Sequence, residues 1–191
     1  MVKKTVLFTE SIQHLKIIND DFNNLLLSKL KEAEDKNYLN KASNVFGIQT
    51  KDVMCEEIFT FIKVLMDQCL TNLFRGHSTK FHITNFWINR NNKGSFNRTH
   101  IHPGGHLSAV YYVKAPKNCV DIIFSNPNIA SVMQGFDKLG DPEFQSEVSV
   151  KPEAGTFILF PAYMPHEVQP NQSDEERISA SFNVQVELVD G

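Results

Sequence analysis

Three of the seven histidines fall within one short segment, Asn97-Arg98-Thr99-His100-Ile101-His102-Pro103-Gly104-Gly105-His106. His100 and His102 are two residues apart, and in an extended strand side chains at this spacing point to the same face. The Pro-Gly-Gly sequence that follows predicts a turn, so the pair lies at the end of a strand. Both imidazoles could then reach one metal ion, and the alternative is a strand end that is rich in histidine for no chemical reason.

His166 is a candidate for a third ligand. It follows an apolar strand predicted over residues 156–160 and a turn that contains two prolines. A lone histidine in such a place is usually a structural hydrogen-bond partner, but next to a His-x-His pair it can complete a metal site. Three ligands on one side of an ion leave coordination positions open for substrate or oxygen, which is typical of catalytic sites.

Arg177 begins the last predicted strand, eleven residues after His166. In an extended strand, Arg177, Ser179 and Asn183 share one polar face, while the residues between them form an apolar face. A guanidinium on such a face could bind a carboxylate with its planar fork, and Ser179 would add a hydroxyl to the same oxygens. Alternatively, the polar face meets solvent.

The elements that must position these residues come in two groups along the chain. Apolar side chains at helical spacing predict one helix over about residues 19–36 and a second over about 54–74, with a polar loop over 38–50 between them. Strands are predicted over residues 5–8, 81–89, 107–114, 120–124, 148–150, 156–160 and 177–188. This order predicts a mainly β chain with N-terminal helices, folded as an antiparallel sandwich or jelly roll.

Length and composition limit the classes of protein. The 191 residues predict a single domain, 1–191, in which a helical part (1–78) packs on a β core (79–191). The formal net charge of −3 and the scattered basic residues argue against a nucleic acid partner, and no apolar run is long enough to cross a membrane. Three cysteines without C-x-x-C spacing favour a reducing, cytoplasmic compartment. The oligomeric state stays open, and a homodimer is one option.

Several short motifs follow one another between about residues 86 and 185. They are Trp87-Ile88-Asn89, Lys93-Gly94, His100-Ile101-His102-Pro103-Gly104, Leu107-Ser108-Ala109-Val110-Tyr111-Tyr112-Val113, Pro152-x-x-Gly155, Leu159-Phe160-Pro161, Pro165-His166 and Arg177-Ile178-Ser179-x-Ser181-Phe182-Asn183. In order and spacing this set resembles the 2-oxoglutarate- and iron(II)-dependent oxygenases of marine phages and bacteria, over about residues 86–185. The resemblance implies a double-stranded β-helix, a form of jelly roll, located in the cytoplasm of the host if a phage encodes the chain.

The resemblance also implies roles for individual residues. His100 matches the first histidine of the iron site, His102 matches the position that usually holds a carboxylate, and His166 matches the distal histidine. Arg177 matches the basic residue that binds the far carboxylate of 2-oxoglutarate, and Ser179 its frequent partner. Tyr112, which shares a strand face with Ser108 and Val110, is a candidate contact for 2-oxoglutarate. The implied activity is hydroxylation of a C–H bond of an unidentified substrate with iron(II) and 2-oxoglutarate as cofactors.

The chain departs from the wider pattern at His102, where aspartate or glutamate is usual. Three neutral imidazoles leave an iron(II) site with two positive charges, whereas a carboxylate would leave one. Asp121 and Glu167 are minor candidates for a replacement carboxylate. Glu167 follows His166 directly, so in an extended segment its side chain points away from the metal.

Four more residues are candidate substrate contacts. Asn85 and Asn89 share a strand face with Trp87, Asn183 shares the face of Arg177, and His106 follows the turn after the histidine pair. His106 also stands where cupins carry a ligand after their His-x-His, although we favour a place beside the ligands or the substrate. The substrate could be a small molecule or a protein. The open alternatives are a cupin-type metalloenzyme that does not use 2-oxoglutarate, a non-catalytic jelly-roll binding or structural protein, and a structural zinc site.

Overall fold

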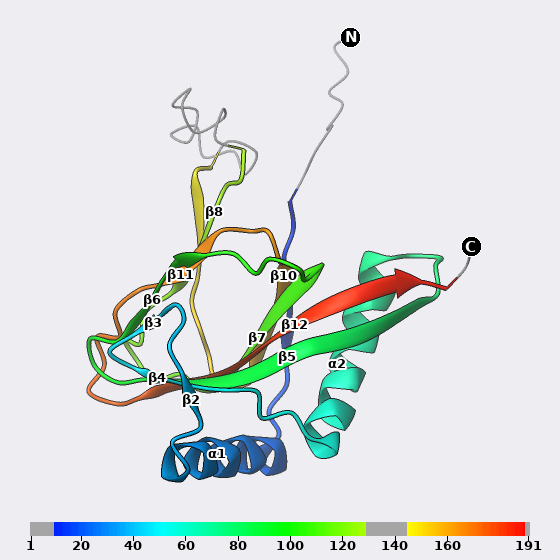
Figure 1. Cartoon of the computed structure of the whole chain (residues 1–191). Coiled ribbons are helices and arrows are strands. Elements are labelled where there is room, and N and C mark those ends of the chain that lie inside the picture. Colours follow the sequence, from blue (N-terminus) through cyan, green and yellow to red (C-terminus); the bar gives the residue numbers. More distant parts are fainter. Residues whose placement is uncertain (1–9, 129–144, 190–191) are drawn as a thin grey trace.

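The fold is described by a computed structural model, which covers residues 10–128 and 145–189. Two antiparallel sheets face each other, and two helices lie outside the larger one (Figure 1). The larger sheet contains, in spatial order, β1 (Gln13–Lys16), β10 (Thr156–Pro161), β7 (Leu107–Lys114), β12 (Arg177–Leu188), β5 (Thr79–Asn91), β4 (Ile48–Thr50) and β2 (Leu39–Asn40). The smaller sheet contains β3 (Asn44–Val45), β6 (Phe96–His100), β11 (His166–Val168), β8 (Ile122–Ser125) and β9 (Glu147–Val150).

Strands that are neighbours in space come from distant parts of the sequence. The last strand, β12, lies between β5 and β7, and β11 lies between β6 and β8. From β5 to β8 the chain passes from one sheet to the other at every strand, and it does so again from β10 to β12. This winding is that of a jelly roll, the double-stranded β-helix, and it confirms the predicted fold class.

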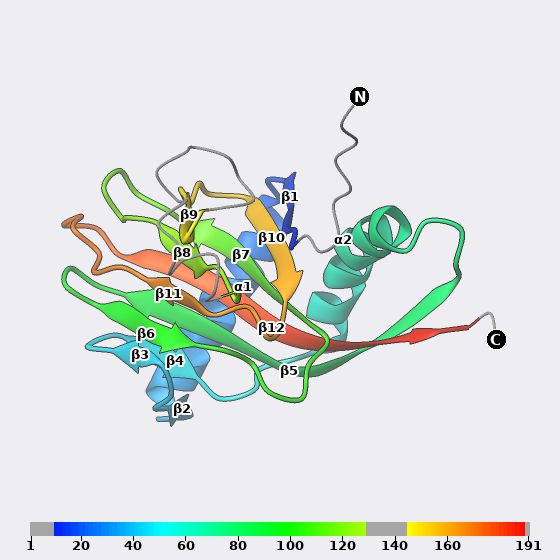
Figure 2. The ribbon, with the colours of Figure 1, turned by 90° about the horizontal axis from the view of Figure 1, so that it is seen from above.

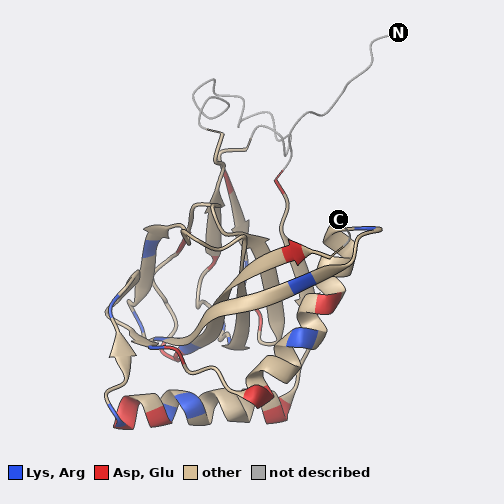
Figure 3. Cartoon of the chain, turned by 45° about the vertical axis from the view of Figure 1, so that its right-hand side comes forward, with Lys and Arg blue, Asp and Glu red and all other residues tan. Residues whose placement is uncertain are grey.

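The two helices cover the outer face of the larger sheet. Helix α1 (Asp20–Asp35) begins after Asn19, whose side-chain oxygen accepts the backbone N–H of Phe22 at 2.8 Å. Helix α2 (Glu56–Leu73) packs Ile58, Ile62 and other apolar residues into the same core. Both helices carry charged side chains, with acidic positions toward both ends of α1 and of the charged part of α2 and lysines between them (Figure 3). No helix of the described residues combines the length and apolar character needed to cross a membrane.

The N-terminal part contributes more strands than the sequence predicts. The segment predicted as a polar loop over residues 38–50 contains β2, β3 and β4, so it extends both sheets. β1 and β11 are also absent from the prediction. All five strands have two to four residues, and such short strands form because a partner strand is available rather than because of their own propensity. The strand predicted over residues 5–8 lies outside the described residues.

β-Bulges change which side chains of a strand face the inside of the sandwich. Between β6 and β11, His100 pairs with His166 and Asn97 pairs with Val168, so two residues of β6 lie opposite one of β11. Asn97 and His100, three residues apart, therefore both face inward. A second irregularity lies where β12 pairs with β5, between Asn183 and Val184. Beyond it, the β5–β12 pair extends past the neighbouring strands (Figure 2).

Gly155 offers a test of how β1 is attached to the sandwich. Its N–H donates to the carbonyl of Tyr112 at 2.7 Å, and its carbonyl accepts the N–H of Ile17 at 2.8 Å. Its φ of +80° favours glycine, and a Cβ would lie 2.7 Å from the carbonyl oxygen of Ile17. We expect Gly155→Ala to lower the free energy of unfolding by about 3 kcal/mol, because backbone strain and a backbone clash add.

The matched control is Gly94→Ala. Gly94 has a similar φ of +81°, but a Cβ there would meet no atom within 4 Å. Gly94→Ala should lower the free energy of unfolding by only about 1 kcal/mol, because it adds backbone strain without a clash. Urea unfolding of both variants measures the difference, and equal losses would show that β1 can shift away without penalty.

Candidate metal centre

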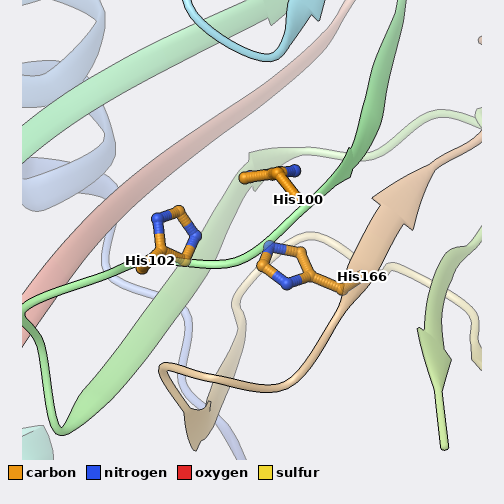
Figure 4. A group of neighbouring side chains, drawn as sticks. All are labelled: His100, His102 and His166. Atoms are coloured by element: carbon orange, nitrogen blue, oxygen red, sulfur yellow. The ribbon is translucent and has the colours of Figure 1, made fainter. Parts of the chain in front are cut away.

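Three histidine side chains meet inside the sandwich (Figure 4). His100 is the last residue of β6, His166 is the first residue of β11, and these two lie directly opposite each other in the β6–β11 pair. His102 lies in the turn after β6, where its N–H donates to the carbonyl of Ala162 at 2.8 Å. One ring nitrogen from each of the three lies within 4.8 Å of the others. The structure therefore brings all three predicted ligands together.

Backbone carbonyls orient two of the rings. The Nδ1 of His100 lies 2.7 Å from the carbonyl oxygen of Arg98, and the Nδ1 of His166 lies 2.9 Å from that of Met164. A carbonyl can only accept a hydrogen bond, so each Nδ1 carries the hydrogen and each Nε2 keeps its lone pair. This is the tautomer in which Nε2 can bind a metal ion.

The surroundings keep the imidazoles neutral. Burial, and then the proximity of His166 and His100, lower the pKa of His102 to about 3. Burial, and then the proximity of His100, lower the pKa of His166 to about 4, and burial also lowers the pKa of His100. All three are therefore uncharged at pH 7 and available as ligands. A bound cation would reinforce the neutral state, because it repels a proton.

The histidines line a cavity between the two sheets. The side chains around it come from both sheets, and they are Ser43, Trp87, Asn89, Asn97, His100, His102, Ala109, Val110, Tyr112, Ile122, Phe160, His166, Val168, Arg177, Ser179 and Ser181. No aspartate or glutamate of the described residues belongs to this lining. The cavity is thus an apolar and amide-lined chamber whose charged side chain is a single arginine.

Arg177 lies in this chamber with 2% of its surface exposed. Its Nη1 donates to the carbonyl of Cys119 at 2.7 Å, while its Nη2 is buried and has no hydrogen-bond partner in the described part of the chain. Ser179 lies two residues further along β12, between Asn89 of β5 and Tyr112 of β7. Burial raises the pKa of Tyr112, so its phenol keeps its proton and can donate it in a hydrogen bond.

The predicted site residues fall into two groups. Seven of them line the cavity: His100, His102, His166, Arg177, Ser179, Tyr112 and Asn89. Asn85 and Asn183 lie next to the cavity lining, where Asn183 donates to Asn85 at 3.0 Å and accepts from Ser108 at 2.7 Å. His106 accepts the N–H of Val186 at its Nδ1, at 3.0 Å. Asn85, Asn183 and His106 thus form hydrogen bonds within or to the β5–β12 pair. Their role as substrate contacts stays a prediction.

The two candidate carboxylates point elsewhere. Glu167 accepts a hydrogen bond from the Thr99 hydroxyl at 2.6 Å, and Asp121 accepts one from Ser149 at 2.6 Å. Neither residue lines the cavity. The histidine cluster therefore has no carboxylate partner within the described residues.

Sequence patterns miss three contributors to the site. Asn97 faces inward because of the bulge in β6, and Ser43 reaches the cavity from the segment before β3. The third is the backbone carbonyl of Cys119, which holds Arg177. Neither a bulge nor a contact to a backbone carbonyl can be recognised from residue type or spacing. Of the two adjacent tyrosines, Tyr112 faces the cavity, whereas Tyr111 faces helix α1 and donates to Asn23 at 2.9 Å.

Solved structures with the same architecture come from several organisms. A prolyl-4-hydroxylase of Pseudomonas putida is 19% identical, with a TM-score of 0.60 over 92% of this chain and 93% of that one. The viral collagen prolyl hydroxylase vCPH from Paramecium Bursaria Chlorella virus-1, in its 2OG complex, is 17% identical, with a TM-score of 0.60 over 91% of this chain and 94% of that one. HygX from Streptomyces hygroscopicus, with nickel and 2-oxoglutarate bound, is 11% identical, with a TM-score of 0.62 over 92% and 83%. At these identities the likeness shows the fold.

The sequence itself shows the family. A comparison with curated proteins found no match. A family model described as "Putative 2OG-Fe(II) oxygenase" matches residues 85–183, which is more than half of the chain. The match spans β5 to β12 and includes every cavity residue named above except Ser43. The chain therefore belongs to the 2OG-Fe(II) oxygenases, enzymes that use iron(II) and 2-oxoglutarate.

Proposed function

We propose that the chain hydroxylates a C–H bond with iron(II) held by His100, His102 and His166, and with 2-oxoglutarate anchored by Arg177. The observation that carries this assignment is the unpartnered Nη2 of Arg177, buried in the same cavity as the three imidazoles. A buried cationic donor without an acceptor is unfavourable by a few kcal/mol, on the order of the desolvation penalty of a charged group. A carboxylate is its natural acceptor.

The donor set fits the two cofactors of the family. Imidazole nitrogens are suitable ligands for iron(II), and three of them leave positions open for a chelating cosubstrate and oxygen. Three neutral imidazoles leave the full charge of the ion in the cavity, next to the charge of Arg177. 2-Oxoglutarate carries two negative charges at its two ends, so its charge is complementary to both positions.

The residues of the chain bind and orient, while the cofactors supply the oxidation. When bound, they couple hydroxylation of the substrate to the conversion of 2-oxoglutarate and oxygen into succinate and carbon dioxide. Ser179 and the protonated Tyr112 face each other in the β12–β7 pair and line the same cavity as Arg177, so each can donate to a carboxylate there. Val110, Ile122 and Phe160 give the cavity apolar walls that exclude water.

The substrate class remains broad in this proposal, because both small molecules and proteins fit an oxygenase of this fold. The solved relatives include prolyl hydroxylases and HygX with hygromycin B bound. The order and spacing of the motifs over about residues 86–185, taken together, support an origin among marine phages or bacteria. Three free thiols, at Cys55, Cys69 and Cys119, support a reducing cytoplasm.

The role of Arg177 can be tested by cosubstrate binding without oxygen. We expect iron(II) and 2-oxoglutarate, added anaerobically to the metal-free protein, to give the visible charge-transfer absorption of the chelate. Arg177→Gln should raise the Kd of 2-oxoglutarate by about thirtyfold or more, because a buried charge pair loses one partner. Arg90→Gln, which removes an arginine that pairs with Glu34 outside the cavity, is the control and should keep the wild-type Kd. Folded wild-type protein without the absorption would contradict the proposed function.

The role of His102 can be decided by two substitutions. His102→Ala should lower the affinity for cobalt(II), a stand-in for iron, by at least about tenfold, because a ligand is lost. His102→Asp should keep metal binding but raise the Kd of 2-oxoglutarate severalfold, because the added carboxylate removes one net positive charge from the site. Equilibrium dialysis and anaerobic titration measure the two constants. Wild-type cobalt affinity in His102→Ala would show that only two histidines bind the metal.

The depressed histidine pKa values predict how stability depends on pH. The pKa of His166 is about 4 in the folded protein against an ordinary value of 6.5, so the unfolded chain binds more protons between these values. Stability is therefore fully present above pH 6.5 and is lost as the pH falls toward 4, by up to about 1.4 kcal/mol per pH unit for each such histidine. We expect metal-free wild type to lose more stability than His166→Gln between pH 7.5 and pH 5. Urea unfolding measures this, and parallel losses would contradict burial of a neutral histidine.

A further inference from the structure

The orientation of Arg177 depends on one backbone carbonyl. Within the described residues, Nη1 of its guanidinium donates a hydrogen bond to the carbonyl of Cys119, Nη2 has no partner, and no carboxylate pairs with it. The guanidinium is a rigid planar fork, so a fixed Nη1 also fixes the direction of Nη2. The position of the Cys119 carbonyl therefore determines where the free donor points in the cavity.

The residues on both sides of Cys119 have unusual backbone conformations. Asn118 has a φ of +66° and Val120 a φ of +59°. This left-handed region is uncommon for residues other than glycine, and for a β-branched residue such as valine it is a genuine outlier. Glycine at either position would adopt the same conformation without strain. The chain thus holds a strained backbone on both sides of the carbonyl that contacts Arg177.

Neighbouring segments keep this conformation in place. Gln172 donates its N–H to the carbonyl of Asn118 at 3.2 Å, and Gln169 donates to the carbonyl of Asp121 at 3.3 Å. Cys119 is 3% exposed and donates its own N–H to Pro116 at 3.1 Å. The segment is therefore bonded to the β11–β12 connection, which leads into Arg177 itself. Strained backbone persists only where the surroundings over-determine it, and such strain clusters at functional sites.

We infer that the strained segment Asn118–Val120 is a positioning device, which holds the Cys119 carbonyl against Arg177 so that Nη2 is presented to the far carboxylate of 2-oxoglutarate. This inference rests on the proposed function of Arg177. It gives the backbone carbonyl of Cys119 a part in the affinity for 2-oxoglutarate, in addition to the side chains of Arg177, Ser179 and Tyr112. Asn118 and Val120 do not line the cavity, so in this proposal they act through Arg177.

Glycine substitutions separate positioning from ordinary structural support. Asn118→Gly and Val120→Gly relieve the strain and let the carbonyl move, so each should raise the Kd of 2-oxoglutarate about fivefold, and the double variant about tenfold or more. Asn37→Gly is the matched control, because Asn37 is also an exposed asparagine with a positive φ, of 50°, at the end of α1. It should keep the wild-type Kd while changing stability to a similar extent as Asn118→Gly.

The experiment uses the full chain, loaded anaerobically with iron(II). It titrates 2-oxoglutarate by its charge-transfer absorption, and it measures cobalt(II) affinity and urea midpoints for the same variants. Positioning predicts a weakened Kd with unchanged metal affinity, and for Asn118→Gly a urea midpoint that matches that of Asn37→Gly. 2-Oxopentanoate, which has the same chain length but lacks the far carboxylate, should bind all variants equally.

Three outcomes overturn the inference, and the third differs from the first two in also removing the proposed function. If the glycine variants keep the wild-type Kd while Arg177→Gln weakens binding, the strained segment has no positioning role and the proposed function stands. The same conclusion follows if 2-oxopentanoate and 2-oxoglutarate weaken in parallel. If wild-type protein binds no 2-oxoglutarate, the proposed function itself fails, and the inference fails with it.

Discussion

The pairing of β6 with β11 is the constraint on which the site depends. It places His100 directly opposite His166, although the two are far apart in the sequence. A hydrogen-bonded pair of strands fixes the separation of facing side chains to within a few ångströms, so two ligands are positioned before any metal arrives. The third, His102, is added by the turn that follows, whose backbone is tied to Ala162. The carbonyls of Arg98 and Met164 then set the tautomer of the first two rings.

The electrostatics of the cavity follow from the groups that are buried in it, which are three imidazoles and one guanidinium. Burial lowers the pKa of all three imidazoles, neighbouring histidines lower the pKa of His102 and His166 further, and the lining contains no carboxylate among the described residues. Arg177 remains as a cation with a single carbonyl partner. A buried cation without a counterion is unfavourable, and it makes the cavity a host for a ligand with negative charge. In the proposed iron site, a histidine at position 102 in place of a carboxylate would increase this requirement, because an ion bound there would keep its full charge.

Much of this arrangement can be predicted from sequence, since regular strands obey simple periods. The two-residue spacing of His100 and His102, and that of Arg177 and Ser179, places each pair on one face, and all four residues line the cavity. The family resemblance is needed to connect these pairs with His166, because no local pattern joins residues from different strands. The short strands β2, β3 and β4 escape prediction because their sequences are polar and their pairing depends on the rest of the sheet. Asn85 and Asn183 share the correct faces but lie beyond the cavity lining, next to a bulge.

Backbone irregularities also escape prediction, and they lie next to the histidines and next to the carbonyl that contacts Arg177. At the metal end, a bulge in β6 lets Asn97 and His100 face inward together, which a period of two forbids. At the anion end, left-handed residues on both sides of Cys119 direct a carbonyl toward Arg177. A regular strand presents every second side chain to the same face over its whole length, so it cannot turn two residues of odd spacing to one face. In this chain, the bulge in β6 and the left-handed residues beside Cys119 make these changes of direction. The backbone thus sets the geometry of the cavity, while the side chains supply its chemistry.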